Sequence, residues 1–312
     1  MSGLAFRTAR RSEAKPLVGL YAESGKGKTW SALMLARGFV GPKGRIGMVE
    51  TESGRGEVYA DTLPGGYEVL PLREDFSPRT FGEAITAAEA AGLDALIIDS
   101  ASHEWEGVGG VLHMAAMNQE EGKKGPLVWQ KPKIDHQRHF LGRLLQTPIK
   151  LVIVCMRAKY PMEETVKDGK KEWTRSKTLE PKQSEDILYE MMIHGWIDEE
   201  HRFNVTKYTR PDLAQVIKNH EPISIATGEA LARWAHGGAA AAPTRAAPAP
   251  RSSTDMDEVI AHIVSAKTES ELRAIAEVAK KLPKDEQEQV RLAYKAQSDF
   301  LRRRPDEPGA RG

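Results

Sequence analysis

The chain has few or none of the features that define several protein classes. It contains one cysteine, Cys155, among 312 residues, which excludes an intramolecular disulfide framework. No uninterrupted apolar run is long enough to span a bilayer, and residues 1–7 are not followed by the apolar core of a secretory signal. We therefore expect a cytoplasmic protein with no membrane partner.

An excess of charge of one sign is also lacking. The sequence has 45 lysine and arginine residues and 44 aspartate and glutamate residues, which gives a formal net charge of +1. Such a protein has no global field that attracts nucleic acid, so any such binding must come from local groups of cations. The hydrophobic content of 40% is sufficient for a full core, and the length suggests one large domain with a smaller one.

The sequence does contain a strong nucleotide-binding pattern near its beginning. An apolar run at 17–22 leads into a glycine-containing turn, which ends in Gly-Lys-Thr and passes directly into a helical pattern at 30–36. A phosphate-binding P-loop requires this order of strand, loop and helix. The predicted nucleotide-binding residues are Ala22, Glu23, Ser24, Gly25, Lys26, Gly27, Lys28, Thr29 and Trp30.

Each residue type in this loop has a physical role in binding ATP. Gly25 and Gly27 let backbone N–H groups approach phosphate oxygens, and the following helix adds the positive end of its dipole. We expect Lys28 to reach the β- and γ-phosphates and the Thr29 hydroxyl to bind Mg²⁺. Ala22 replaces the first glycine of the motif, and it is small enough for the turn.

Beyond the P-loop, apolar runs alternate with helical patterns, which indicates a mostly parallel sheet covered on both faces. Strands are predicted at 45–49, 67–70, 93–98, 150–156, 187–193 and 203–207. Helices are predicted at 77–91, 134–145 and 227–234. The third of these strands runs into Asp99 and looks like a Walker B strand, whose carboxylate holds Mg²⁺.

Composition divides the chain into five parts. Residues 1–14 are predicted to be a flexible polar arm, and residues 15–236 the α/β P-loop domain. Residues 237–253 are mostly alanine, proline and glycine, which is typical of a linker. Residues 254–303 have the narrow apolar faces of a helical hairpin or three-helix module, and residues 304–312 are predicted to be a disordered tail.

The order of these motifs resembles the ATPase core of RecA-type recombinases. The resemblance rests on the P-loop and on the segments 48–52, 97–100 and 152–159. More closely, the chain resembles phage-encoded P-loop ATPases of the AAA family with a RecA-like core, among them the Sak-type single-strand annealing group. This implies an α/β, RecA-like P-loop NTPase fold over roughly residues 15–236.

The resemblance also implies roles for individual residues. In RecA-like proteins a glutamate after the second strand polarises the attacking water, which corresponds to Glu52, with Glu50 as the alternative. The strand that ends at Met156 would lie between the Walker A and Walker B strands. Arg157 would then lie near the γ-phosphate as a catalytic or sensing residue, although a structural salt bridge is an equal alternative.

Two further segments correspond to the DNA-binding loops of RecA-like proteins. Both contain cations interleaved with aromatic residues, the combination that backbone tracking and base stacking use. The second segment also contains acidic residues, so a solvated hairpin is the alternative. The predicted DNA-binding residues are Lys123, Lys124, Trp129, Lys131, Lys133, Lys167, Lys170, Lys171, Trp173 and Arg175.

His136 and His139 stand three positions apart beside Asp135, a spacing compatible with a metal ion on a helix. No cysteine or second histidine pair completes a site, which favours a surface or core role for both histidines.

Two functional hypotheses from different classes follow. The first is a Mg²⁺-dependent ATPase of phage DNA recombination or single-strand annealing, cytoplasmic in the bacterial host. It would act on single-stranded DNA as a ring or filament and dock other recombination or replication proteins through its C-terminal module. The second is an ATP-dependent switch or assembly protein that binds protein partners and not DNA. A small-molecule kinase is disfavoured, because no arginine-rich lid is evident.

Overall fold

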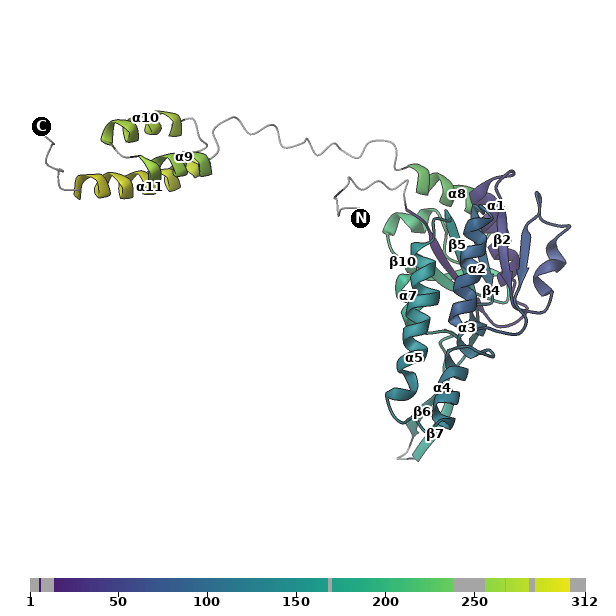
Figure 1. Ribbon diagram of the computed structural model, residues 1–312. Helices are drawn as coiled ribbons and strands as arrows, with labels where there is room; N and C mark the ends of the chain where they lie inside the picture. The colour runs from purple at the N-terminus through teal and green to yellow at the C-terminus, as the bar shows by residue number, and fades with distance from the viewer. Residues whose placement is uncertain are drawn as a thin grey trace, which may run out of the picture. The chain divides into compact units, whose positions relative to one another are not determined.

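The computed structural model describes residues 6, 14–167, 170–237, 256–266, 268–280 and 284–303 (Figure 1). The chain divides into two compact units, residues 1–240 and 241–312, and each is described by itself. The predicted arm, linker and tail lie almost wholly outside the described residues.

The first unit is organised around a mixed sheet of nine strands within the described residues. Most neighbouring strands pair in parallel, and β10 and β8 supply the antiparallel pairs. The strand order is β11-β10-β9-β1-β5-β4-β2-β3, with β8 paired to β5. The strands are β1 (Leu17–Ala22), β2 (Ile46–Glu50), β3 (Glu68–Pro71), β4 (Ala95–Asp99), β5 (Leu151–Lys159), β8 (Glu180–Pro181), β9 (Ile193–Ile197), β10 (Arg202–Tyr208) and β11 (Glu221–Pro222). The prediction of an α/β protein with a mostly parallel sheet is confirmed.

The position of β5 has a direct consequence for the site. It pairs in parallel with β1 on one side, where Val18 faces Ile153, and with β4 on the other, where Ile98 faces Val154. It therefore lies between the P-loop strand and the strand that ends in Asp99, as the resemblance implied. Because the carboxyl ends of parallel strands meet at one edge, the residues that follow β1, β4 and β5 come together.

Helices cover both faces of this sheet, as the continuous apolar strands require. One core cluster joins the sheet to α1 (Lys28–Val40) and α8 (Ile225–His236). The other joins it to α2 (Pro78–Ala90), the π-helical turn η3 (His136–Leu141) and α6 (Gly142–Gln146). Successive β5 residues alternate between the two clusters, since side chains of a strand point to opposite faces.

One predicted strand is wrong. The run at 187–193 forms α7 (Glu185–Glu190), and β9 begins only at Ile193. Ser184 stands at the N-cap position, and two acidic residues follow in the first turn, which favours a helix start. A short apolar run does not distinguish a strand from a helix, and here only one face is buried, since Ile187 is enclosed while Tyr189 is exposed.

The remaining elements lie between or beyond these layers. The helix predicted at 134–145 begins earlier, because α5 precedes η3 and α6. The segment 162–175 forms a two-stranded antiparallel hairpin of β6 and β7, which is drawn with α4 and α5 at the lower end of the first unit in Figure 1. These elements are η2 (Arg55–Tyr59), α3 (Ser102–Glu106), α4 (Val111–Glu120), α5 (Leu127–Asp135), β6 (Met162–Lys167), β7 (Lys170–Arg175) and η4 (Pro211–Gln215).

The second unit contains three helices in its described residues, α9 (Met256–Ser265), α10 (Glu269–Ala279) and α11 (Lys284–Arg303). Their buried contacts come from Val259, Ile263, Ala266, Leu272 and Val290. The Thr268 hydroxyl accepts a hydrogen bond from the Glu271 N–H at 3.2 Å and so caps α10. None of the helices in the described parts of the two units has both the length and the apolar character needed to cross a membrane.

Candidate nucleotide-binding site

A cavity of about 1300 Å³ lies at the carboxyl edge of the sheet. The loop between β1 and α1 forms one wall, and residues at the carboxyl ends of β4 and β5 and after β2 form others. Seven of the nine predicted nucleotide-binding residues line it, namely Glu23, Ser24, Gly25, Gly27, Lys28, Thr29 and Trp30.

The other two predicted residues contribute outside the cavity. Ala22 ends β1, and its carbonyl accepts a hydrogen bond from Lys28 Nζ at 3.2 Å. Lys26 turns away, and its Nζ donates to Glu199 Oε1 at 3.0 Å. Ala22 therefore supports the loop through its backbone, and the Lys26 side chain ties the loop to the turn between β9 and β10.

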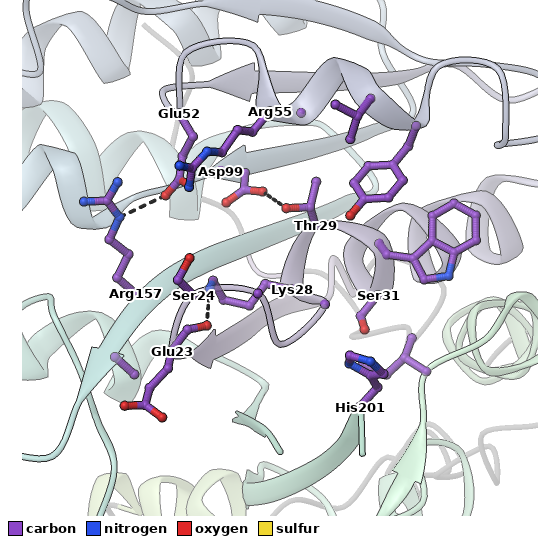
Figure 2. A pocket seen from close by; sticks show the side chains of 18 of the residues that line it. Glu23, Ser24, Lys28, Thr29, Ser31, Glu52, Arg55, Asp99, Arg157 and His201 are labelled. Atoms are coloured by element: carbon purple, nitrogen blue, oxygen red, sulfur yellow. Dashed lines mark hydrogen bonds and ion pairs between the residues drawn. The ribbon is translucent and has the colours of Figure 1, made fainter. Parts of the chain in front are cut away.

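The loop has the backbone geometry that its glycines permit. Gly25 and Gly27 have φ values of 79° and 89°, in the region that residues with a Cβ avoid. Lys28, the first residue of α1, is 9% exposed, and its Nζ also donates to the Glu23 carbonyl at 3.0 Å (Figure 2). The ammonium group thus lies across the loop, where a phosphate would compete with these carbonyls for its protons.

Thr29 and Asp99 form a pair of oxygen donors at the cavity floor. Thr29 Oγ1 donates to Asp99 Oδ2 at 2.5 Å (Figure 2). Burial raises the pKa of Asp99 to about 6, and the bond from Thr29 opposes part of this shift. Within the described residues, no group of three or more His, Cys, Asp or Glu could hold a metal ion. Two protein oxygens nevertheless fit Mg²⁺, which takes most of its ligands from phosphates and water.

The two glutamates after β2 have different environments. Glu50 is fully buried, and it accepts hydrogen bonds from the N–H groups of Glu52 (2.6 Å) and Gly54 (3.0 Å) and pairs with Arg73 (2.6 Å). Glu52 lines the cavity, whereas Glu50 does not. Of the two, only Glu52 is in a position to contact a water molecule in the cavity.

Arg157 lies near the carboxyl end of β5, at the end of the cavity where Glu52 lies. Its Nε donates to Glu52 Oε1 at 2.9 Å, as Figure 2 shows, and Arg55 lies 3.6 Å from the other oxygen of Glu52. Arg157 therefore forms the salt bridge that was one alternative, and it also lines the cavity, where the other alternative, a catalytic or sensing role, stays a prediction.

Several cavity residues were missed by sequence reasoning. Tyr59 and Val58 come from η2, and the Tyr59 ring lies 5.4 Å from the Trp30 ring. Together with Ile223 they give the cavity an apolar wall. On another side, His201 Nδ1 lies 3.0 Å from the Lys26 carbonyl oxygen. None of these residues follows a motif, because the fold brings them in from separate segments.

The predicted DNA-binding residues lie on two segments outside the cavity lining. They belong to the α4–α5 region and the β6–β7 hairpin, and the cavity lining contains none of them. Trp129 and Trp173 are 37% and 65% exposed. Lys124 and Lys133, which stand before and after Trp129 in the sequence, are exposed. The side chains of Lys167 and Lys170 lie outside the described residues.

Other predicted cations are in ion pairs. Lys123 pairs with Glu121 at 2.9 Å and Lys171 with Glu164 at 2.5 Å. Lys131 pairs with Asp135 one helical turn away. Arg175 lies 3.3 Å from Glu23, so the hairpin contacts the loop between β1 and α1.

His136 lies in the core of the first unit. It is 2% exposed, and its Nδ1 lies 2.9 Å from Glu104 Oε1 while its Nε2 lies 2.9 Å from Ser184 Oγ. Both ring nitrogens are therefore engaged, as the core role required.

No known family model matches this chain, and no curated protein matches it either.

Proposed function

We propose that this protein is a Mg²⁺-dependent ATPase with a RecA-like P-loop core, similar to the phage-encoded ATPases of the AAA family. One observation carries the proposal. Lys28, the Thr29–Asp99 pair and Glu52 come from three separate strand ends and meet at one cavity. A phosphate cradle, an oxygen pair and a carboxylate are the components that phosphoryl transfer to water requires. The position of β5 between β1 and β4 supports the RecA-like assignment.

The residues would divide the reaction between them. The loop N–H groups and Lys28 bind the phosphates, and Thr29 and Asp99 hold Mg²⁺, which neutralises charge on the phosphate oxygens. Glu52 accepts a hydrogen bond from the attacking water and orients it toward the γ-phosphate, while Arg157 restrains the Glu52 carboxylate. The apolar wall of Trp30, Tyr59 and Ile223 receives the base. Positioning and charge stabilisation thus supply most of the catalysis.

We further propose that the ATPase acts on single-stranded DNA in the cytoplasm, in recombination or annealing. The exposed Trp129 and Trp173 stand among lysines on two segments, which is the combination that single-stranded DNA binding uses. A ring or filament of this chain would align these segments, and the three-helix unit would dock other recombination or replication proteins. The second candidate, a switch that binds proteins and not DNA, is favoured by the ion pairs of Lys123, Lys131 and Lys171.

The deciding experiment measures ATP hydrolysis with Mg²⁺, with and without single-stranded DNA, for the protein and for Lys28→Ala. We expect hydrolysis that DNA stimulates and that the variant loses. If DNA does not change the rate of hydrolysis and no DNA binding is detected at low salt, the result would favour the protein-binding switch. Equal activity of the variant would refute the nucleotide site itself.

A further inference from the structure

Lys182 lines the cavity but has no role in the proposed ATP hydrolysis described so far. It follows β8, which pairs antiparallel with the end of β5. The Lys182 N–H donates to the Arg157 carbonyl at 2.7 Å, and the Lys182 side chain lines the cavity. The fold therefore brings a second cation next to Arg157, at the end of the cavity where Glu52 lies.

A carboxylate outside the cavity lining holds this cation. Glu106, the last residue of α3, lies 3.2 Å from Lys182 Nζ, and it also lies 3.9 Å from Arg157 Nη1. The side chains of Lys182 and Glu106 are both partly exposed, at 33% and 26%. A pair this accessible to water is weak and can exchange one partner for another.

The backbone around Lys182 is held much more firmly. The next residue, Gln183, donates through Nε2 to the Ala101 carbonyl at 2.9 Å and to Glu104 Oε2 at 3.1 Å. Glu104 is fully buried and is also bonded to His136. Buried polar groups with all partners present fix one arrangement of the chain. The Lys182 backbone is thus held in place, while its partly exposed ammonium group has only the Glu106 carboxylate as its ion-pair partner among the described residues.

We propose that Lys182 is a ligand of the γ-phosphate, supplied by the same chain that binds the nucleotide. This inference rests on the proposed ATPase function. When ATP binds, the Lys182 ammonium exchanges Glu106 for γ-phosphate oxygens, because these carry more negative charge than one carboxylate. ADP has no γ-phosphate, so Lys182 returns to Glu106. Glu106 therefore competes with the γ-phosphate and makes the site discriminate between the two nucleotides.

This role predicts effects of opposite sign for the two partners. The full-length protein is titrated with ADP and with the non-hydrolysable analogue AMP-PNP, in Mg²⁺, by calorimetry. We expect Lys182→Ala to weaken AMP-PNP binding about tenfold, as for loss of a charge-assisted hydrogen bond. ADP binding should change less than about twofold. Glu106→Gln should tighten AMP-PNP binding several-fold, and Lys182→Arg should retain most of the wild-type affinity.

A purely structural salt bridge would give a different pattern. Lys182→Ala and Glu106→Gln would then shift affinity in the same direction, and equally for both nucleotides, and that result would overturn the proposal. Lys182→Gln provides a second variant should Lys182→Ala fail to fold. Lys28→Ala tests the proposed ATPase function separately from the role of Lys182. If Lys28→Ala binds AMP-PNP like the wild type, the proposed function fails; if only the Lys182 and Glu106 variants behave like the wild type, the Lys182 role alone fails.

Discussion

Arg157 donates a hydrogen bond from Nε to Glu52 Oε1 at 2.9 Å, and this contact joins β5 to the segment that follows β2. The two strands are not neighbours, since β4 lies between them. The contact therefore spans the carboxyl edge of the sheet above Asp99. It limits the orientations of the Glu52 carboxylate, which a residue that orients water requires.

Replacing Glu52 should separate binding from catalysis. Glu52→Gln keeps the size of the side chain and removes its charge. We expect kcat for ATP hydrolysis to fall by about 10²- to 10⁴-fold, the usual range for loss of a general base, with ATP affinity little changed. Steady-state kinetics and nucleotide titration measure the two effects.

The matched control is Glu50→Gln. Glu50 is buried, and its two carboxylate oxygens accept hydrogen bonds from the N–H groups of Glu52 and Gly54, so replacing one oxygen with an NH₂ donor should lower the melting temperature. A Glu52→Gln protein that hydrolyses ATP at the wild-type rate would remove Glu52 from the mechanism.

Asp99→Asn should stabilise the protein without nucleotide or metal. Burial raises the pKa of Asp99 to about 6 from 3.8, so the folded state binds more protons than the unfolded state between these values. The free energy of unfolding therefore falls as pH rises through this window, and the charged form is unfavourable above it. Asparagine can still accept the Thr29 hydrogen bond. At pH 8 with a chelator, denaturant unfolding should show a gain of about 2 kcal/mol.

The same variant should lose the stabilisation that Mg²⁺ with ATP gives to the wild type, because a neutral amide is a poor ligand for Mg²⁺. A variant less stable than the wild type at pH 8 would mean that the Asp99 charge is not a cost to the folded protein.

Local pattern carried most of the fold and part of the site. The order of strand, glycine-containing turn and helix around Lys28 could be predicted because these segments are contiguous, and the place of Asp99 at a strand end because it ends a continuous apolar run. The choice between Glu50 and Glu52 could not be predicted, since it depends on which carboxylate Arg73 binds from a separate segment. Tyr59 reaches the cavity from η2, and Lys182 reaches it because β8 pairs with β5. Neither position can be predicted from the local sequence. The error at 187–193 arose because a short apolar run is compatible with either element.

His194 should make the protein less stable at acidic pH. It is 7% exposed in β9, and its Nδ1 has no hydrogen-bond partner among the described residues. Burial, with a smaller effect of the Lys207 charge, lowers its pKa from 6.5 to about 4. The unfolded state therefore binds more protons between these values, and the free energy of unfolding falls as pH drops from about 6.5 to 4.

Replacement with glutamine isolates this effect. The difference in unfolding free energy between the wild type and His194→Gln should change by roughly 2–3 kcal/mol between pH 8 and pH 4, in favour of the variant at low pH. Both proteins should carry Asp99→Asn, because Asp99 titrates in the same window with the opposite sign. A difference that does not depend on pH would show that the pKa of His194 is the same in the folded and unfolded states.

Adding a methyl group at Gly228, where α8 packs against α1, should destabilise the protein. A Cβ on Gly228 would lie 2.2 Å from the Leu35 carbonyl oxygen and 2.7 Å from the Phe39 nitrogen, both backbone atoms. Alanine is intrinsically better than glycine in a helix by about 1 kcal/mol, but backbone atoms of α1 cannot move aside as a flexible side chain can. We expect Gly228→Ala to reduce the free energy of unfolding by about 1–3 kcal/mol.

The control is Ala226→Gly, an exposed position on α8 where only the helix propensity changes, with a cost of about 1 kcal/mol. Because α1 begins with Lys28 and Thr29, a displaced α1 should also weaken nucleotide binding in Gly228→Ala, whereas the control should bind normally. A Gly228→Ala protein as stable as the wild type would require α8 to lie farther from α1 than this packing indicates. A destabilised protein with unchanged nucleotide affinity would show that the P-loop keeps its geometry independently of the other end of α1.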